Sequence, residues 1–403
     1  MNLNGSLGRR ASIVFVLDQL QDVNIARGLI YLAGREFDTE IVLLANQRFF
    51  ARDRGSVWGG EISALMADTG ATITTFIGPD GLERAYRGRH GIVIAPAESD
   101  LSPHRAAHMA LRLAPASFVR VTLQHGHECP GFLQNRDQVI AHGENVTFAA
   151  DVVCAWGPPS GLTSLVASER SKVLVTGPST LLNRPASDPR HPPVAGGIVC
   201  ENLHSARLTA SGDHGAYFVS AFETFAAALQ QERRGVTLRP HPGGQYFMRN
   251  RMSVPENVTL NSLPIYHVDL SQYAYGLSAP STMIVDMALA DIPVAVWRDP
   301  AGVMDVTGYA GLSLIGKAED WLAFARDARF HREALLAVQH AWLDSLGIVR
   351  NRSEVYRRFA RLIAAALSCT DTHQPQPSGK HMRCGAGQPG KKRAKPNAGA
   401  FLQ

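Results

Sequence analysis

Short apolar runs, many of them β-branched, recur along the first 180 residues and alternate with segments of helical spacing. One such segment is "RAAHMALRLA" (105–114), which is long enough to cross back over a sheet as a helix. This alternation predicts a mostly parallel, doubly wound α/β sheet. The predicted strands cover residues 12–18, 39–45, 71–77, 91–96, 118–123, 151–156 and 172–177.

The alternation stops at "RPASDPRHPP" (184–193), where four of ten residues are proline. Proline favours extended or turn structure, so residues 184–196 are predicted to link two domains. The first domain then covers residues 1–183, and a second doubly wound domain covers residues 197–316. Its predicted strands begin near 197, 236, 257, 275 and 291, and one helical face in 216–231 is predicted to face the core because it carries Phe218, Phe222, Phe225 and Leu229.

The chain ends in two segments of different character. Residues 317–369 have helical spacing and are predicted to pack along the domain junction. Residues 370–403 are rich in Pro, Gly and Lys and contain few core-forming residues, so a disordered tail is predicted. Deleting this tail is expected to leave folding intact.

The positive charge of the chain is concentrated in this tail. Six Lys or Arg residues against Asp371 give 6 − 1 = +5 there, which equals the formal charge of the whole chain. The body is therefore neutral, and a nucleic-acid partner is not expected. The tail is expected to be solvated. The alternative is that its positive charges attach it to anionic lipid at the inner face of a plasma membrane.

The remaining bulk properties indicate a cytoplasmic protein. No run of 18 apolar residues could span a membrane, and the N-terminal apolar run lacks a signal-peptide cleavage site. An odd number of cysteines without CxxC spacing suits reduced thiols and argues against a disulfide framework or a zinc ribbon. These are Cys129, Cys154, Cys200, Cys369 and Cys384.

Three polar clusters follow predicted strands. They are "QHGHECPG" (124–131) in the first domain, and "RPHPGG" (239–244) and "SAPST" (278–282) in the second. Doubly wound domains bind ligands at the carboxyl ends of their strands. The three clusters therefore predict a binding site in a cleft where the two domains face each other.

The two clusters of the second domain are both suited to phosphate. The prolines beside His241 restrict its backbone, Arg239 and His241 offer N–H donors, and the following glycines allow close backbone approach. Ser278, Ser281 and Thr282 lie at a predicted helix start, where unpaired N–H groups favour an anion, although plain helix capping is the alternative. Asp286, one turn later, could accept hydrogen bonds from ribose hydroxyls or face solvent.

The order of these motifs resembles a known superfamily. "QHG", "ADVVCAWGPPSGLTSL", "KVLVTGP", "RPHP" and "SAPSTMIVDMALADIPVAVW" look like the bacterial CDP-glycerol glycerophosphotransferases and capsule-polysaccharide transferases, over roughly residues 90 to 300. The resemblance implies a GT-B fold, with two Rossmann-like domains facing a cleft. It also implies that His241 and the Ser281/Thr282 helix start hold the donor phosphates, and that the region of His125 binds the acceptor or supplies a base.

What the resemblance implies is a transferase of bacterial surface-polysaccharide synthesis. It would move a sugar from a nucleotide-activated donor, of CMP or CDP type, to a hydroxyl of a glycan or lipid-linked glycan. Transfer of a polyol phosphate is the runner-up. A neutral histidine can serve as the base, and positive groups can stabilise the leaving nucleotide, so neither a metal nor another cofactor is expected.

The base and the enzyme class remain open at this stage. "HEC" after "QHG" departs from the family pattern, so His125, His127 and Glu128 are all candidates, with His125 expected closest to the strand end and Gly126 allowing the chain to turn. One alternative to a transferase is a metallohydrolase with an HxH metal site. Such an enzyme needs further His and Asp ligands on later strands of one barrel, whereas the proline-rich break favours two sheets. A sugar-nucleotide epimerase and a non-catalytic binding module are the others.

Overall fold

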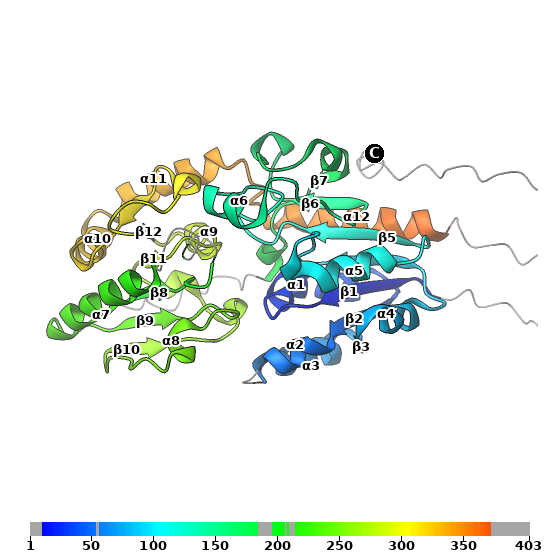
Figure 1. Cartoon of the computed structure of the whole chain (residues 1–403), viewed down its shortest axis with the longest axis horizontal. Helices are drawn as coiled ribbons and strands as arrows, with labels where there is room; N and C mark the ends of the chain where they lie inside the picture. The colour runs from blue at the N-terminus through cyan, green and yellow to red at the C-terminus, as the bar shows by residue number, and fades with distance from the viewer. Residues whose placement is uncertain (1–9, 54–55, 184–195, 206–207, 209–213, 372–403) are drawn as a thin grey trace, which may run out of the picture.

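The computed structural model describes residues 10–53, 56–183, 196–205, 208 and 214–371. The predicted linker, apart from Gly196, and the tail beyond Asp371 lie outside the described residues. Two parallel sheets of seven and six strands lie side by side, each flanked by helices (Figure 1). The predicted α/β architecture of two doubly wound sheets is confirmed.

The first sheet has the strand order β3-β2-β1-β4-β5-β6-β7, and every neighbouring pair is parallel. All seven predicted strands are present, each within two residues of its predicted ends. Their bounds are β1 (Ser12–Leu17), β2 (Glu40–Asn46), β3 (Thr72–Phe76), β4 (Gly91–Ala95), β5 (Phe118–Leu123), β6 (Val152–Ala155) and β7 (Val173–Val175).

Helices cover both faces of this sheet, which explains why its central strands are mostly apolar runs. Along β1, Phe15 packs with one core and Val14 and Val16 pack with the other. One face carries α1 (Asp22–Glu36), α2 (Gln47–Arg52), α3 (Val57–Thr69) and α12 (Arg352–Asp371), and the other carries α4 (Gly78–Tyr86) and α5 (Arg105–Leu113). A short α6 (Arg136–His142) follows β5.

The second sheet has the order β10-β9-β8-β11-β12-β13 and is also entirely parallel. Strand β13 (Ser313–Ile315) was not predicted; it lies at the edge of the sheet, where Leu314 is exposed, and so lacks a continuous buried apolar run. The predicted phenylalanine stripe of α7 (Gly215–Gln231) is confirmed as core. The other elements are β8 (Gly197–Cys200), β9 (Val236–Arg239), α8 (Tyr246–Arg249), β10 (Val258–Leu260), β11 (Gly276–Ser278), α9 (Met283–Leu289), β12 (Val294–Trp297), α10 (Ala318–Phe330) and α11 (Arg332–Ser345).

Residues 317–369 were predicted to pack along the domain junction, but not all of their helices do so. Helix α10 covers the second sheet, whereas α12 crosses back and buries an apolar face in the core of the first domain (Figure 1). Helix α12 also continues through Asp371, two residues past the predicted end of the helical segment at 369, and Thr370 is buried in its last turn. The chain therefore closes on the domain where it began.

Removing a buried ring from α12 should destabilise the first domain. Phe359 is 2% exposed and packs with the core of that sheet, so Phe359→Ala is expected to lower the free energy of unfolding by about 3–5 kcal/mol. Denaturant unfolding measures this loss. Arg357→Ala, an exposed position on the same helix, is the control, and equal effects of the two changes would contradict the placement of α12.

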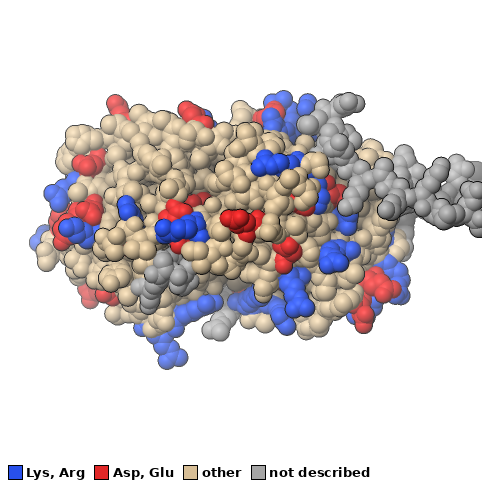
Figure 2. Space-filling view, turned by 45° about the horizontal axis from the view of Figure 1, so that its top comes forward, with Lys and Arg blue, Asp and Glu red and all other residues tan. Residues whose placement is uncertain are grey.

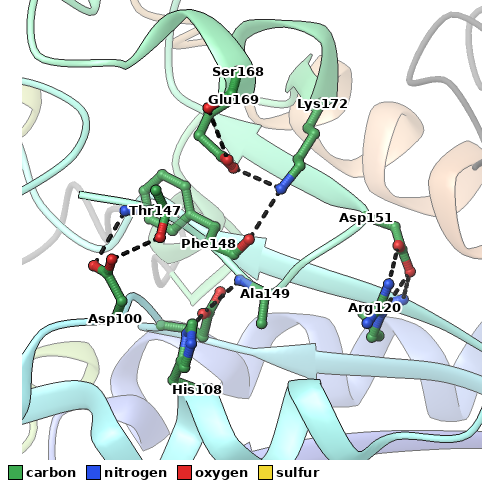
Figure 3. A network of polar contacts seen from close by, with 11 residues as sticks. Asp100, His108, Arg120, Thr147, Phe148, Ala149, Asp151, Ser168, Glu169 and Lys172 are labelled. Atoms are coloured by element: carbon green, nitrogen blue, oxygen red, sulfur yellow. Dashed lines mark hydrogen bonds and ion pairs between the residues drawn. The ribbon is translucent and has the colours of Figure 1, made fainter. Parts of the chain in front are cut away.

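Polar contacts fasten the segment before β6 to its surroundings (Figure 3). Thr147 donates to Asp100 through its backbone N–H (3.1 Å) and its hydroxyl (2.6 Å). Arg120 on β5 forms an ion pair with Asp151, which is also a neighbour in sequence of β6. These contacts fix the paired strands β5 and β6, and with them the strand ends that carry the first polar cluster.

The surface has no dominant sign of charge on the face drawn in Figure 2, where basic and acidic side chains are interspersed with uncharged ones. Within the part of the chain that the structure describes, none of the helices is long and apolar enough to cross a membrane. The predicted contact of the basic tail with lipid falls outside the described residues and stays a prediction.

Candidate functional site

A cavity of about 320 Å³ lies between the carboxyl ends of the two sheets, as the three polar clusters predict. Both domains line it. The first domain contributes Gln21 and Asn24 after β1, and His125 and Glu128 after β5. The second contributes Glu201, Asn202 and His204 after β8, Arg239 and His241 at and after β9, and Ser281, Thr282 and Asp286 after β11.

His125 is half-buried at the wall of this cavity. Its ring meets the His104 ring edge to face, with 5.2 Å between centroids. The Nδ1 atom of His104 is in turn 2.7 Å from the Ser99 hydroxyl, which holds that ring in place. Burial lowers the pKa of His125 to about 4, so the imidazole is neutral at pH 7 and can accept a proton.

His127 points away from the cavity and into the contact between the domains. Its ring packs edge to face against Tyr309 (5.5 Å) and Trp342 (5.7 Å). Its Nε2 lies 3.1 Å from the carbonyl oxygen of Gly308, and since a carbonyl can only accept, Nε2 must carry the proton. Of the three base candidates, the structure therefore brings His125 and Glu128 to the cavity wall and places His127 in an interdomain contact.

Gly126 is required by the approach of the second domain. A Cβ atom at this position would lie 2.7 Å from Oγ1 of Thr282, and the same hydroxyl accepts the backbone N–H of His127 at 3.2 Å. The backbone at Gly126 has no positive φ, so the predicted role in turning the chain is replaced by close contact across the cleft. The cluster after β5 (124–131) and the cluster after β11 (278–282) are therefore in direct contact across the cleft.

The imidazole of His241 is oriented by the residues that follow it. Nδ1 accepts hydrogen bonds from the backbone N–H groups of Gly243 (3.1 Å) and Gly244 (3.3 Å), so the neutral ring carries its proton on Nε2. Burial, with the nearby His204 and Arg239, lowers the pKa of His241 well below its usual value. The glycines were expected to approach a ligand; instead they orient His241, and Gly244 makes room for the His204 ring.

Arg239 lines the cavity but is only 4% exposed. It donates to the backbone oxygen of Leu263 at 2.8 Å, and burial lowers its pKa. This bond links strand β9 to the loop after β10. Part of the guanidinium is therefore occupied by the protein, which leaves fewer of its donors for a ligand than the sequence alone indicates.

The serine and threonine side chains after β11 divide between the core and the cavity. Ser278 is buried and donates to the backbone oxygen of Ala279 at 2.6 Å, behind the loop. Ser281 and Thr282 line the cavity, and Thr282 makes no side-chain capping bond to α9. Because α9 has only seven residues, its dipole is small, and the hydroxyls themselves are the stronger feature for an anion.

Sequence reasoning missed the cavity residues after β1 and β8. Glu201 is buried and accepts the backbone N–H groups of Tyr246 (2.5 Å) and Phe247 (3.3 Å) at the start of α8, while burial raises its pKa. The sequence did contain a signal for them, because "DQLQD" (18–22) and "ENLHS" (201–205) are largely polar runs at the carboxyl ends of predicted strands. The rule that found the other three clusters applies equally to these two.

Asp22, in the first turn of α1, should make stability depend on pH. Its Oδ2 accepts the N–H groups of Asp18 (2.8 Å) and Gln19 (2.7 Å), and burial raises its pKa to about 7. A raised folded-state pKa gives stability that is full below the unfolded pKa near 4 and is lost as pH rises through 7. Asp22→Asn removes this dependence.

The expected result is that the unfolding free energy of Asp22→Asn, relative to the wild type, rises between pH 4 and 8. The rise should be on the order of a few kcal/mol. Denaturant unfolding at several pH values measures it, with the exposed Asp80→Asn as the control. A difference that does not change with pH would show that Asp22 is ionised throughout.

The alternative HxH metal site is not assembled by this geometry. His125 turns to His104 and the cavity, whereas His127 turns to Tyr309 and Trp342. Over the described ranges, no group of three or more His, Cys, Asp or Glu side chains is placed to hold a metal ion. The two imidazole rings therefore lie in different environments and do not point toward a common metal position.

Comparison with known proteins places the fold. No family model matches the sequence, and the curated proteins give no match either. The chain is similar to the UDP-GlcNAc 2-epimerase of Methanocaldococcus jannaschii, in complex with UDP-GlcNAc and UDP (TM-score 0.54, 9% identity, 88% of this chain and 99% of that one).

Two further structures are similar to about the same degree. The wall teichoic acid polymerase TagF gives a TM-score of 0.55 at 9% identity, over 90% of each chain. A structure described as the glycotransferase of kitacinnamycin gives 0.53 at 13% identity, over 89% of this chain and 100% of that one. Identities this low establish the fold alone, and the predicted GT-B-like arrangement of two α/β domains is confirmed.

Proposed function

We propose that the protein is a nucleotide-dependent transferase that moves a sugar from a nucleotide-activated donor to a hydroxyl of a glycan. The observation that carries the proposal is the cavity between the carboxyl ends of the two sheets. In it, a neutral imidazole and a carboxylate from one domain face N–H and hydroxyl donors from the other. Such a cavity can hold an acceptor against a donor phosphate.

The second domain is proposed to hold the donor. The Nε2–H of His241 and the hydroxyls of Ser281 and Thr282 line one wall of the cavity and would donate to phosphate oxygens. Arg239 adds a positive charge behind them. Asp286, one turn into α9, is proposed to accept hydrogen bonds from the ribose hydroxyls, and Ser278 is proposed to shape this loop from behind.

The first domain is proposed to activate the acceptor. As the acceptor oxygen bonds to the anomeric carbon of the donor sugar, its proton passes to His125, and the bond from that carbon to the donor phosphate breaks. The charge that appears on the departing nucleotide is stabilised by the donors around His241. Glu128 is the alternative base, and His127 is proposed to hold the domains together.

The finer parts of the proposal rest on the motif resemblance. These are a CMP- or CDP-type donor, a glycan or lipid-linked glycan acceptor, and bacterial surface-polysaccharide synthesis at the cytoplasmic side of the membrane. No metal or other cofactor takes part in the proposed step, because protein groups supply both the base and the stabilisation of the leaving group. Transfer of a polyol phosphate from a CDP-polyol is the second candidate, since the same donors would bind its phosphates.

Product analysis tests this proposal. The protein is incubated with UDP-, CDP- and CMP-linked donors, with and without an oligosaccharide acceptor. A transferase releases nucleotide and extends the oligosaccharide only when both are present, and polyol phosphate transfer releases CMP from a CDP-polyol. Conversion of a nucleotide sugar to its epimer without any acceptor would overturn the proposal in favour of an epimerase.

A further inference from the structure

A second cavity, of about 390 Å³, opens on the first domain between α1 and α12 and is separate from the interdomain cavity. Its walls are unusually rich in cations and aromatic rings. Three arginines and two tyrosines contribute, against a single carboxylate. The lining includes Arg27, Tyr31, Arg35, Asp68, Asn183, Arg352 and Tyr356.

Two of these arginines have no anionic partner among the residues that the structure describes. The guanidinium of Arg27 lies over the rings of Tyr31 (4.7 Å) and Tyr266 (4.4 Å), and that of Arg35 lies 5.8 Å from the Tyr31 ring. The Nε atom of Arg27 is buried, and no described acceptor binds it. A buried donor without a protein partner is satisfied in a native protein by water, an ion or a ligand, so this Nε–H is available to a bound group.

The acidic side chains nearby are already engaged. Asp68, the one carboxylate of the lining, accepts the hydroxyl of Tyr31 at 2.5 Å. Glu36, at the end of α1, accepts the hydroxyl of Tyr356. Several arginines elsewhere in the first domain form ion pairs, as Arg89 does with Glu40 and Arg120 does with Asp151. The bonds from the two tyrosine hydroxyls leave the carboxylate charges in place, and the lining itself carries three guanidinium groups against the single carboxylate of Asp68.

A groove along the domain contact lies next to both this cavity and the interdomain cavity, because it shares lining residues with each. The groove, of about 320 Å³, shares Asn183 with the basic cavity and shares Ile265 and Asp286 with the interdomain cavity. Tyr266, which stacks with Arg27, lines the groove as well. Thr180 of the first domain also lines both the groove and the interdomain cavity, so a chain of sugar units that leaves the acceptor side past Thr180 would reach the arginines.

We propose that the cavity around Arg27, Arg35 and Arg352 binds a carboxylate or phosphate group carried by the acceptor glycan. This rests on the proposed function, since it assigns a charge to the acceptor. Guanidinium groups bind such anions through paired N–H donors, and tyrosine rings offer flat surfaces to sugar rings. An uncharged glycan leaves the two cations unsatisfied, so the site selects acidic acceptors.

Binding of a defined acidic oligosaccharide to the full-length protein tests the proposal. Calorimetric titrations compare tetragalacturonate, uncharged maltotetraose and inorganic phosphate. Arg35→Gln is the main variant, because Arg35 is exposed and does not contact the other domain. Arg329→Gln is the matched control, since Arg329 is also exposed and lies 5.5 Å from the Phe330 ring on the far helix α10.

The expected result is that tetragalacturonate binds, that Arg35→Gln weakens this binding at least tenfold, and that Arg329→Gln leaves it unchanged. Added salt should weaken the wild-type complex. Equal binding to wild type and Arg35→Gln, no binding of tetragalacturonate, or binding of free phosphate alone would overturn the proposal.

The same variants separate this inference from the proposed function. Arg35→Gln should leave nucleotide binding unchanged, because Arg35 does not line the interdomain cavity. Tetragalacturonate binding that depends on Arg35, in a protein without transfer activity, would support the anionic-glycan site and reject the donor chemistry. Nucleotide transfer to acidic and neutral acceptors with equal efficiency would do the reverse.

Discussion

Replacing His241 by alanine is expected to lower kcat/KM for transfer by about 30- to 1000-fold, or about 2–4 kcal/mol in transition-state free energy. The reason is that Nε2–H is the donor left over once Gly243 and Gly244 have bound Nδ1. Alanine removes that donor from a buried wall where water cannot replace it fully. The loss should therefore fall on stabilisation of the leaving phosphate.

Steady-state kinetics with the best donor of the product assay measures this loss. His340→Ala is the control, since His340 is exposed and pairs with Asp291 away from the cavity. His241→Asn, which keeps an N–H donor, should recover part of the activity. Near-normal turnover of His241→Ala would contradict the proposal that this imidazole binds the donor phosphates.

His125→Ala is expected to lower kcat by about 10²- to 10⁴-fold while leaving nucleotide affinity nearly unchanged. His125 is assigned to the acceptor side, so the loss should appear in the chemical step. His127→Ala should instead reduce thermal stability, because its ring packs against Tyr309 and Trp342 from the second domain. The two histidines, separated by Gly126, should therefore be told apart by measuring kcat for one variant and thermal stability for the other.

The pH profile adds an independent check on His125. With a pKa of about 4, the imidazole is deprotonated and competent above that value. The contribution of this group to kcat/KM should be constant from about pH 5 to 8 and should fall as pH drops through 4, where protonation removes the base. Equal inactivation of His125→Ala and His127→Ala, with loss of stoichiometric zinc by elemental analysis, would favour the metal-site alternative instead.

The fold was predictable because the strands of a parallel sheet buried on both faces form short, continuous apolar runs. Every predicted strand of the first sheet is present, and the phenylalanine face of α7 lies in the core. Strand β13 was not predicted because it is an edge strand with an exposed Leu314 and lacks such a run. The return of α12 to the first domain could not be predicted either, since its apolar face would fit any open sheet surface.

The site was predictable in outline from the position of polar runs after strands. That position does not tell which side chain of a loop enters the cavity. His127 and Ser278 turn away because of partners distant in sequence or behind the loop, such as Gly308 for His127. The predicted role of Gly126 in a turn was wrong for a similar reason. Thr282 of the other domain leaves no room for a side chain at Gly126, and only the folded chain brings the two residues together.

The central claim is that the interdomain cavity binds a nucleotide through His241, and a titration tests it most directly. UDP, CDP, CMP and GDP are added in turn to the wild type and to His241→Ala, and heat of binding is measured. The account predicts one site per chain for at least one of these nucleotides, with affinity at least tenfold weaker in His241→Ala. Absence of binding by all four, or equal affinity in the two proteins, would contradict it.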